Sequence, residues 1–233
     1  MLSTKDLALL GQKGISEKQI EEQLDCFRKG FPFLEIMASA SVEKGISVID
    51  KEAQVGYMEA WDAYLNQNKR ILKFVPASGA ASRMFKDLYE FLDSDSNEPF
   101  SPFMEKFFAG LTSFAFYNAL DAVCLKNEKR TIPQLLSDKE YKAVVNNLLS
   151  SSGLNYGQLP KGMLLFHKYP EGSRTPMEEH LVEGALYASS NHEANIHFTV
   201  SSEHKAFFEK KVNDKIDFYT QKFGIQYNVS FSE

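Results

Sequence analysis

The stretch Ile71–Met84, ILKFVPASGAASRM, decides the fold of this chain. It begins with a β-branched and aromatic run that ends at Pro76, continues as a turn of small residues and then enters a helical pattern. A short apolar run predicts a strand, and a glycine-containing turn that leads into a helix is typical of α/β proteins. The stretch therefore predicts a strand over 71–76 and a helix over about 80–92.

The turn between these two elements predicts a binding site for an anion. Its residues are Ala77, Ser78, Gly79, Ala80, Ala81 and Ser82, with Arg83 directly after them. The first N–H groups of a helix have no partner within the helix, and the helix dipole places positive charge at the same end. The guanidinium of Arg83 suits phosphate oxygens. The alternative is structural, because small residues also let a helix pack close to a strand.

Strand and helix patterns alternate after residue 157. The expected elements are a helix over 175–188, a strand over 194–200, a helix over 202–223 and a strand over 225–231. Thr175, Pro176 and Glu178 form a complete helix start, with a cap, a proline at the first position and a glutamate at the third. Strands separated by single helices form right-handed crossovers. The sequence therefore predicts an α/β fold, a three-layer, mostly parallel, Rossmann-like sheet with helices on both faces.

Residues 1–70 are predicted to form a helical N-terminal extension. Ser16 and Gln19 have the spacing of a capping box, which opens a helix that ends at Gly30. A second helix is expected after Asp50, because apolar residues recur there at helical spacing. This region contains no strand pattern that would add to the sheet.

Residues 94–157 are interpreted as a helical insertion. One face of its first helical pattern is aromatic-rich and carries Phe103, Phe107, Leu111 and Phe114. Ser137 and Glu140 have the spacing of another capping box, which predicts a helix to about Leu149. The sequence thus predicts an α/β domain over 71–233 that a helical insertion interrupts over about 94–157.

The composition excludes several classes of protein. The chain has 233 residues, of which 43% are apolar and 24% charged, as in an ordinary globular protein. The net charge of −5 argues against a general nucleic-acid-binding protein, and no apolar run approaches the ~20 residues that cross a membrane. The solitary Cys26 and Cys124 fit neither a metal pattern nor a disulfide framework, and the N-terminus is too polar for a secretory signal. We therefore expect a cytoplasmic protein.

Several acidic and histidine residues are interpreted as ordinary surface. His180 and Glu183 form an H-x-x-E motif, but no second histidine has the helical spacing of a zinc pair. Glu179 and Glu183 are therefore expected on a solvated helix face. Asp93 and Asp95 have the look of a metal-binding pair but are expected in a solvated loop.

Arg174 and His197 are also interpreted as residues without a role in the site. Arg174, just before the Thr175 cap, could contact a phosphate but is expected in a solvated loop. His197 alternates with Ile196 and Phe198 along a predicted strand, so it should lie on the opposite face of the sheet as a packed or rim histidine. Neither residue is therefore assigned to the site.

The turn and a later segment together resemble the signatures of the sugar nucleotidyltransferases, the pyrophosphorylases that make nucleotide sugars. The first signature of these enzymes reads roughly A-G-G-x-G-T-R-M/L, and Ala77–Met84 stands in its place. The second is a Pro-Lys pair, which Pro160 and Lys161 match. The chain is also similar to an uncharacterised bacterial family that is grouped with these enzymes. The likeness spans about 71–93 and 157–233.

The resemblance implies a nucleotide-diphospho-sugar transferase-like fold of the GT-A type and a nucleotidyl transfer reaction. A nucleoside triphosphate and a sugar 1-phosphate would give a nucleotide sugar and pyrophosphate. The turn over 77–82 would hold the nucleotide, and Arg83 would contact the departing pyrophosphate. Lys161 would offset charge between the α-phosphate and the sugar phosphate. Mg²⁺ would bridge phosphate oxygens as a cofactor.

The chain departs from the family pattern in three ways. Ser78 and Ala81 stand where the family prefers glycine, so the backbone approaches a triphosphate differently. The segment between Arg83 and Lys161 is much longer than in the family, so residues 94–157 must loop out and could form a lid or a partner surface. The family places its metal-binding acidic residues after later strands. We therefore expect the N-terminal portion of a longer protein, or a homo-oligomer.

Two other hypotheses stay open at the level of sequence. The chain could be a nucleotide-binding module of the same fold without catalysis, which the residue at Ala81 and the missing acidic residues would suit. It could instead be a helical interaction protein, in which the α/β part is a scaffold and the phenylalanine-rich insertion is the binding face. Binding of a nucleoside triphosphate that depends on Arg83 and Lys161 separates this last hypothesis from the others.

Overall fold

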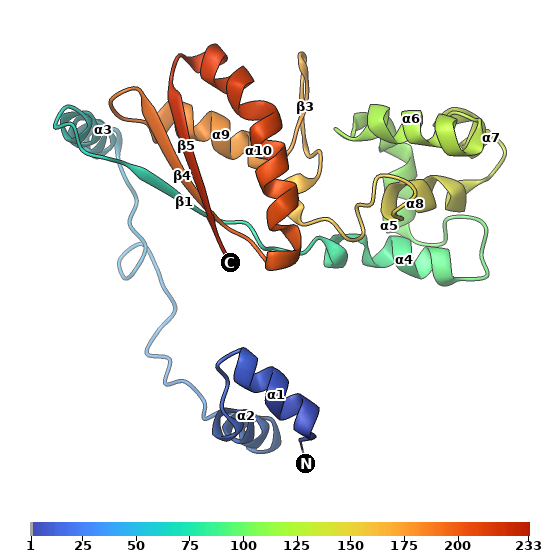
Figure 1. The fold of residues 1–233 in the computed structure, drawn as a ribbon, viewed down its shortest axis with the longest axis horizontal. Helices are drawn as coiled ribbons and strands as arrows, with labels where there is room; N and C mark the ends of the chain where they lie inside the picture. Colours follow the sequence, from blue (N-terminus) through green and yellow to red (C-terminus); the bar gives the residue numbers. More distant parts are fainter. Residues whose placement is uncertain (1) are drawn as a thin grey trace. The chain divides into compact units, whose positions relative to one another are not determined.

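Helices and a long non-helical segment over 30–50 form the first part of the chain. The computed structural model describes residues 2–233, and they divide into two compact units, one that ends at Tyr57 and one that begins at Met58 (Figure 1). The first unit contains α1 (Thr4–Gln12) and α2 (Glu17–Lys29), and α3 (Lys51–Leu65) spans the boundary between the units. The predicted capping box of Ser16 and Gln19 is confirmed. The helix expected after Asp50 is confirmed as α3, and the Asp50 carboxylate caps it by accepting the Ala53 N–H at 2.8 Å.

A parallel sheet of three strands forms the centre of the second unit (Figure 1). Its strands are β1 (Leu72–Pro76), β4 (Glu193–Thr199) and β5 (Gln226–Ser232), in the order β1-β4-β5. Two helices connect them, α9 (Pro176–Tyr187) before β4 and α10 (Ser202–Phe223) before β5. The predicted α/β class is confirmed, together with the complete cap at Thr175 and the helix end at Gly224.

Both connecting helices cover the same face of this sheet. A Cβ added at Gly184 of α9 would lie 2.7 Å from the Ile196 side chain, so α9 packs closely on β4. The Phe198 ring lies 6.1 Å from the ring of Phe208 on α10, and Ile196 and Phe198 point to one face. Both crossovers step in the same direction across the sheet, so right-handed connections place both helices on one side.

The three-layer arrangement with helices on both faces is therefore not confirmed. Leu72 and Phe74 lie on the opposite face and are 56% and 58% exposed. His197 lies on that face as well, stacked on Phe74 with 5.4 Å between ring centroids. Its predicted position on the face opposite Ile196 and Phe198 is confirmed, and it lies in the central strand β4. Around the three-stranded sheet, two layers are therefore present, the sheet itself and the layer of α9 and α10.

Residues 94–157 form helices and no strand. The elements here are α5 (Pro102–Ala109), η2 (Leu111–Ser113), α6 (Tyr117–Glu128), α7 (Ile132–Ser137) and α8 (Tyr141–Leu149). They pack with the preceding η1 (Ser82–Phe85) and α4 (Lys86–Asp93) around one core. Leu88, Phe91, Leu120 and Leu148 in that core are almost completely buried. The helical block thus has a hydrophobic core of its own.

The predicted capping box at Ser137 is wrong. Ser137 is the last residue of α7, and α8 begins only at Tyr141, without a capping side chain. The capping box in this region is formed by Thr131 and Gln134, which open α7. A positive φ at Lys139 separates the two helices. Two local cap signals compete in this stretch, and the earlier one forms because Pro133 favours a helix start there.

A short hairpin precedes α9. It consists of β2 (His167–Tyr169) and β3 (Gly172–Arg174), and η3 (Lys161–Met163) lies before it in the sequence. The Ser173 hydroxyl donates to the Ala115 carbonyl at 2.7 Å, and the Lys168 ammonium to that of Thr112 at 3.2 Å. The hairpin therefore contacts the helical block.

Candidate functional site

The carboxyl ends of the three parallel strands meet at one edge of the sheet. Pro76, Thr199 and Ser232 stand side by side in the register of β1, β4 and β5. Beyond them, the Ala77 N–H donates to the Thr199 carbonyl at 2.8 Å and the Val200 N–H donates to the Ser232 carbonyl at 3.0 Å. Open α/β sheets bind ligands outside the carboxyl ends of their strands. The turn that follows β1 lies at this edge.

The second signature segment lies directly against this turn. The Lys161 N–H donates to the Gly79 carbonyl at 3.0 Å. Ala80 and Pro160 form an isolated antiparallel bridge next to this hydrogen bond. Two segments that the whole helical block separates in sequence are thus joined through their backbones. We name the turn over 77–82 together with Pro160 and Lys161 the cradle.

The residues of the turn differ in what they offer to a ligand. Ser78, Gly79, Ala80 and Ser82 are exposed, and Ala77 is half-buried. Ala81 is 1% exposed and packs into the core of the helical block, so its side chain is structural. A Cβ added at Gly79 would meet nothing within 4 Å, so the space around this backbone is open.

Arg83 and Lys161 are both exposed cations at the ends of the cradle. Arg83 lies in the 3₁₀ helix η1, which precedes α4, so the predicted helix after the turn is present but begins at Ser82. Lys161 is the first residue of η3. Among residues 2–233, neither side chain forms an ion pair. Two cations without a protein partner suit an anionic ligand.

His204 also belongs to this edge, and sequence reasoning missed it. One ring nitrogen of His204 lies 3.2 Å from the Gln158 carbonyl, and the other lies 2.8 Å from the Ser201 hydroxyl. The histidine therefore joins the loop after β4 to the segment that leads to Lys161. The sequence held one local indication of the Ser201 contact. Ser201 is the N-cap of α10, and a histidine three residues later can reach the side chain of a cap residue.

The predicted solvated face is wrong for Glu179, whose side chain is 13% exposed, and holds only in part for Glu183, which is 36% exposed and paired. Glu183 accepts from Lys73 of β1 at 2.6 Å and lies 3.0 Å from a ring nitrogen of His180. Burial alone would raise the pKa of Glu183, but hydrogen bonds from Lys73, Tyr187 and His180 outweigh it and lower the pKa to about 2. The partner of Glu183 comes from a distant strand, which the helical pattern could not indicate.

Arg174 lies in a similar ionic contact and not in a solvated loop. Its guanidinium stacks on the Tyr169 ring at 3.7 Å and pairs with Glu179 at 3.3 Å. Next to it, the cap residue Glu178 is 2% exposed and lies 3.2 Å from Lys215 of α10. Burial would raise the pKa of Glu178, but hydrogen bonds and the charges of Lys211 and Lys215 outweigh it and lower the pKa. These contacts tie β3, α9 and α10 together and explain the fold at this place.

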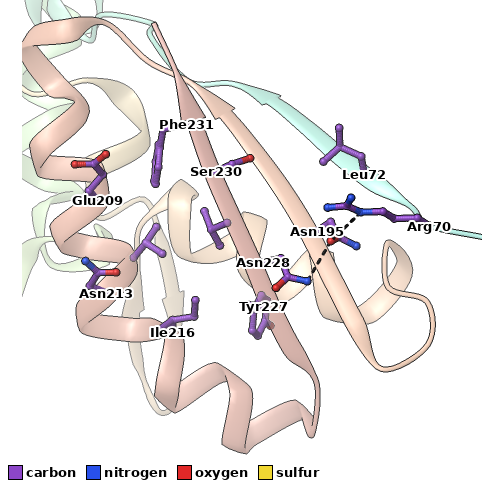
Figure 2. Close-up of a pocket in the computed structure, with 12 residues that line it drawn as sticks. Arg70, Leu72, Asn195, Glu209, Asn213, Ile216, Tyr227, Asn228, Ser230 and Phe231 are labelled. Atoms are coloured by element: carbon purple, nitrogen blue, oxygen red, sulfur yellow. Dashed lines mark hydrogen bonds between the residues drawn. The ribbon is translucent and has the colours of Figure 1, made fainter.

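A pocket lies elsewhere, along the outer edge of β5. Its volume is about 610 Å³. Figure 2 shows α10 residues such as Glu209 and Asn213 on one side of β5 and the chain of hydrogen bonds Arg70–Asn195–Asn228 on the other. These two hydrogen bonds measure 3.2 Å each. None of the cradle residues lines this pocket, and we do not place the predicted chemistry there.

The acidic side chains do not form a metal site in the part of the chain that the structure describes. No group of three or more His, Cys, Asp or Glu residues gathers where it could hold a metal ion. Asp95 lies in an exposed bend as predicted, whereas Asp93 is exposed but belongs to α4 as its last residue. Within residues 2–233, no helix has the length and apolar character needed to span a bilayer.

Comparison with known proteins identifies the family. The chain belongs to the family described as "Domain of unknown function (DUF4301)", whose model matches residues 3–233. No curated protein and no solved structure matches the chain.

Proposed function

We propose that this chain is a nucleotidyltransferase-like protein that binds a nucleoside triphosphate in the cradle and joins its nucleotidyl group to a sugar 1-phosphate. The observation that supports this most strongly is the hydrogen bond from the Lys161 N–H to the Gly79 carbonyl. It brings together the two signatures on which the resemblance to sugar nucleotidyltransferases rests. The same proposal includes the nucleotide-diphospho-sugar transferase-like fold, for which the three parallel strands and the position of the turn after β1 are the support.

The proposed chemistry needs alignment and charge compensation from the protein. An oxygen of the sugar phosphate attacks the α-phosphorus, a new P–O bond forms, and the bond to the β-phosphate oxygen breaks. The electron pair of that bond leaves with pyrophosphate, whose charge Arg83 offsets. Lys161 offsets the charge between the α-phosphate and the incoming phosphate. Such positioning and electrostatic stabilisation carry most of the rate enhancement in phosphoryl transfer.

Mg²⁺ enters this proposal through the resemblance alone. Among residues 2–233, no group of three or more His, Cys, Asp or Glu side chains gathers where it could hold a metal ion. Mg²⁺ prefers oxygen ligands and is usually held by one or two carboxylates together with substrate phosphates. We therefore assign the proposed steps to Arg83 and Lys161 and derive none through the ion.

Titration calorimetry of nucleoside triphosphates against single-site variants tests the proposal. Arg83→Ala and Lys161→Ala should each weaken triphosphate binding about tenfold or more, because each removes a charge-assisted contact to phosphate. Both side chains are exposed, so the thermal unfolding of the unliganded variants should match that of the parent. Lys126→Ala, which removes another exposed lysine without an ion pair, is the control and should bind like the parent. Equal triphosphate affinity in the parent, Arg83→Ala and Lys161→Ala would falsify the proposal.

A non-catalytic nucleotide-binding module is the second candidate, and Ala81 favours it, because this residue stands where the resemblance expects glycine and its side chain packs into the core of the helical block. It predicts the same dependence of binding on Arg83 and Lys161 but no release of pyrophosphate when a sugar 1-phosphate is added. The helical interaction protein has less support. Phe107 and Leu111 of its expected binding face are 7% and 1% exposed, because they pack into the core of the helical block.

A further inference from the structure

An apolar cavity of about 420 Å³ opens in the helical block. It lies between η1, which contributes Met84, and α5, which contributes Phe103, Lys106 and Phe107. Phe166, shortly after η3, closes a further side. Sites for small ligands usually measure about 300–1,000 Å³ and are mostly apolar. The size and lining of this cavity are therefore those of a ligand site.

Aromatic rings form one continuous wall of the cavity. The rings of Phe103 and Phe107 lie 6.5 Å apart with 13° between their planes. Phe114 follows at 5.6 Å from Phe107, and Phe116 follows at 5.1 Å from Phe114. Such a wall offers a broad apolar surface with few rotatable bonds, which costs little entropy when a ligand binds.

Part of this surface faces solvent. Met84 and Phe103 are each 42% exposed, and Phe166 is 36% exposed. Contiguous exposed apolar residues around a cavity cost free energy in water and usually mark a binding site. The phenylalanines of the aromatic-rich helix face therefore differ in their surroundings, because Phe107 lies in the core and Phe103 lies at the mouth of the cavity.

The lining selects the chemistry of the occupant. Among the described residues that line it, Lys106 alone has a side chain with a hydrogen-bonding group. A nucleobase or a sugar would bury polar edges without partners here, at a cost of roughly 1–3 kcal/mol for each group. The body of the ligand is therefore apolar. Lys106 is exposed and forms no ion pair among residues 2–233, so the head of the ligand is anionic.

We propose that this cavity binds a single-chain alkyl phosphate, with its chain on the aromatic wall and its phosphate at Lys106. The site is separate from the cradle and does not depend on the proposed function. The ligand is a free amphiphile and not a bilayer surface. The recognition of anionic membranes uses clusters of several basic residues, whereas within residues 2–233 Lys106 is the one cation that lines this cavity.

Titration calorimetry with octyl phosphate, octanol and inorganic phosphate tests this proposal. Octyl phosphate should bind saturably with a negative heat-capacity change, octanol about tenfold more weakly, and inorganic phosphate without measurable affinity for the cavity. Phe103→Ala should weaken octyl phosphate about tenfold, and Lys106→Met should remove the preference for octyl phosphate over octanol. Phe207→Ala and Lys126→Met, which replace an exposed phenylalanine and an exposed lysine outside the cavity, should bind like the parent.

Four results would overturn the proposal. The first is the absence of saturable octyl phosphate binding, and the second is equal affinity in the parent, Phe103→Ala and Lys106→Met. The third is binding of adenosine monophosphate that Phe103→Ala weakens while octyl phosphate does not compete. The fourth is binding to phosphatidic acid vesicles without binding to octyl phosphate. Arg83→Ala separates the two sites, because it should weaken triphosphate binding and leave the affinity for octyl phosphate unchanged.

Discussion

Glu183 shows how one carboxylate on a helix joins two elements of this fold. Lys73 reaches it from β1 at 2.6 Å, and His180 lies one helical turn before it on α9. The Lys73 side chain is 12% exposed, so its ammonium is largely removed from water. A largely buried cation of this kind needs its partner, because an unpaired buried charge costs more than the pair contributes.

The first prediction concerns Lys73→Met. The pKa of Glu183 lies below its ordinary value of 4.5, at about 2, so the ionised form stabilises the fold above about pH 4.5. This stabilisation is lost as the pH falls toward 2. In Lys73→Met, the free energy of unfolding should be about 1 kcal/mol lower at neutral pH and should fall less between pH 6 and pH 3.

Urea unfolding at pH 6, 4 and 3 measures this difference. Lys86→Met is the control, because it breaks the exposed pair with Glu90 and should change stability by less than about 0.5 kcal/mol. A parallel pH dependence in Lys73→Met and the parent would show that Glu183 owes its low pKa to other groups.

Helix ends show which elements can be read from the sequence. The caps at Ser16 and Thr175 and the end at Gly224 depend on residues within one turn, and all three form as predicted. Ser137 fails because a second local signal, Thr131 with Gln134, competes in the same stretch.

The contacts that build the candidate site are of another kind. The Gly79–Lys161 hydrogen bond and the His204–Gln158 contact join segments far apart in the chain. The first could be expected only because the resemblance paired two signatures. The second had no counterpart in the sequence pattern, because nothing in a helix start indicates which distant carbonyl it will face.

The second prediction concerns the end of α8. A Cβ at Gly153 would overlap the Asn147 carbonyl, because the chain turns back there and the Leu154 N–H donates to that carbonyl at 2.8 Å. Gly153→Ala should therefore lower the free energy of unfolding by about 1–3 kcal/mol. Chemical denaturation measures the change. Ser151→Ala, at an exposed position two residues away, should stay within about 0.5 kcal/mol of the parent, and an equal effect of both would contradict the steric argument.

At the scale of the second unit, the order of the strands determines the number of layers, which the sequence did not indicate. The strands and helices of the α/β pattern were each predictable from local periodicity. The number of layers was not, because it depends on whether the chain adds strands in one direction or reverses. With the order β1-β4-β5 there is no reversal, so α9 and α10 share one face. The open face carries Leu72 and Phe74.

The third prediction compares the two faces of the sheet. Phe198 is fully buried under the helices, and Phe74 is 58% exposed on the open face. Phe198→Ala should lower the free energy of unfolding by about 3–5 kcal/mol, whereas Phe74→Ala should change it by less than about 1 kcal/mol. Thermal and urea unfolding of both variants test this. A large loss in Phe74→Ala would indicate that another layer covers the open face in solution.

The bridge between Ala80 and Pro160 has a consequence for how this protein tolerates change in length. The chain leaves the α/β part before the helical block and re-enters it afterwards at neighbouring backbone positions, as in a domain insertion. The block has a hydrophobic core of its own. Insertions, deletions and replacements within it can therefore occur while the two backbone segments that attach it stay paired. Among related chains, differences in sequence and length should concentrate within the helical block and end at Ala80 and Pro160, where the block is attached.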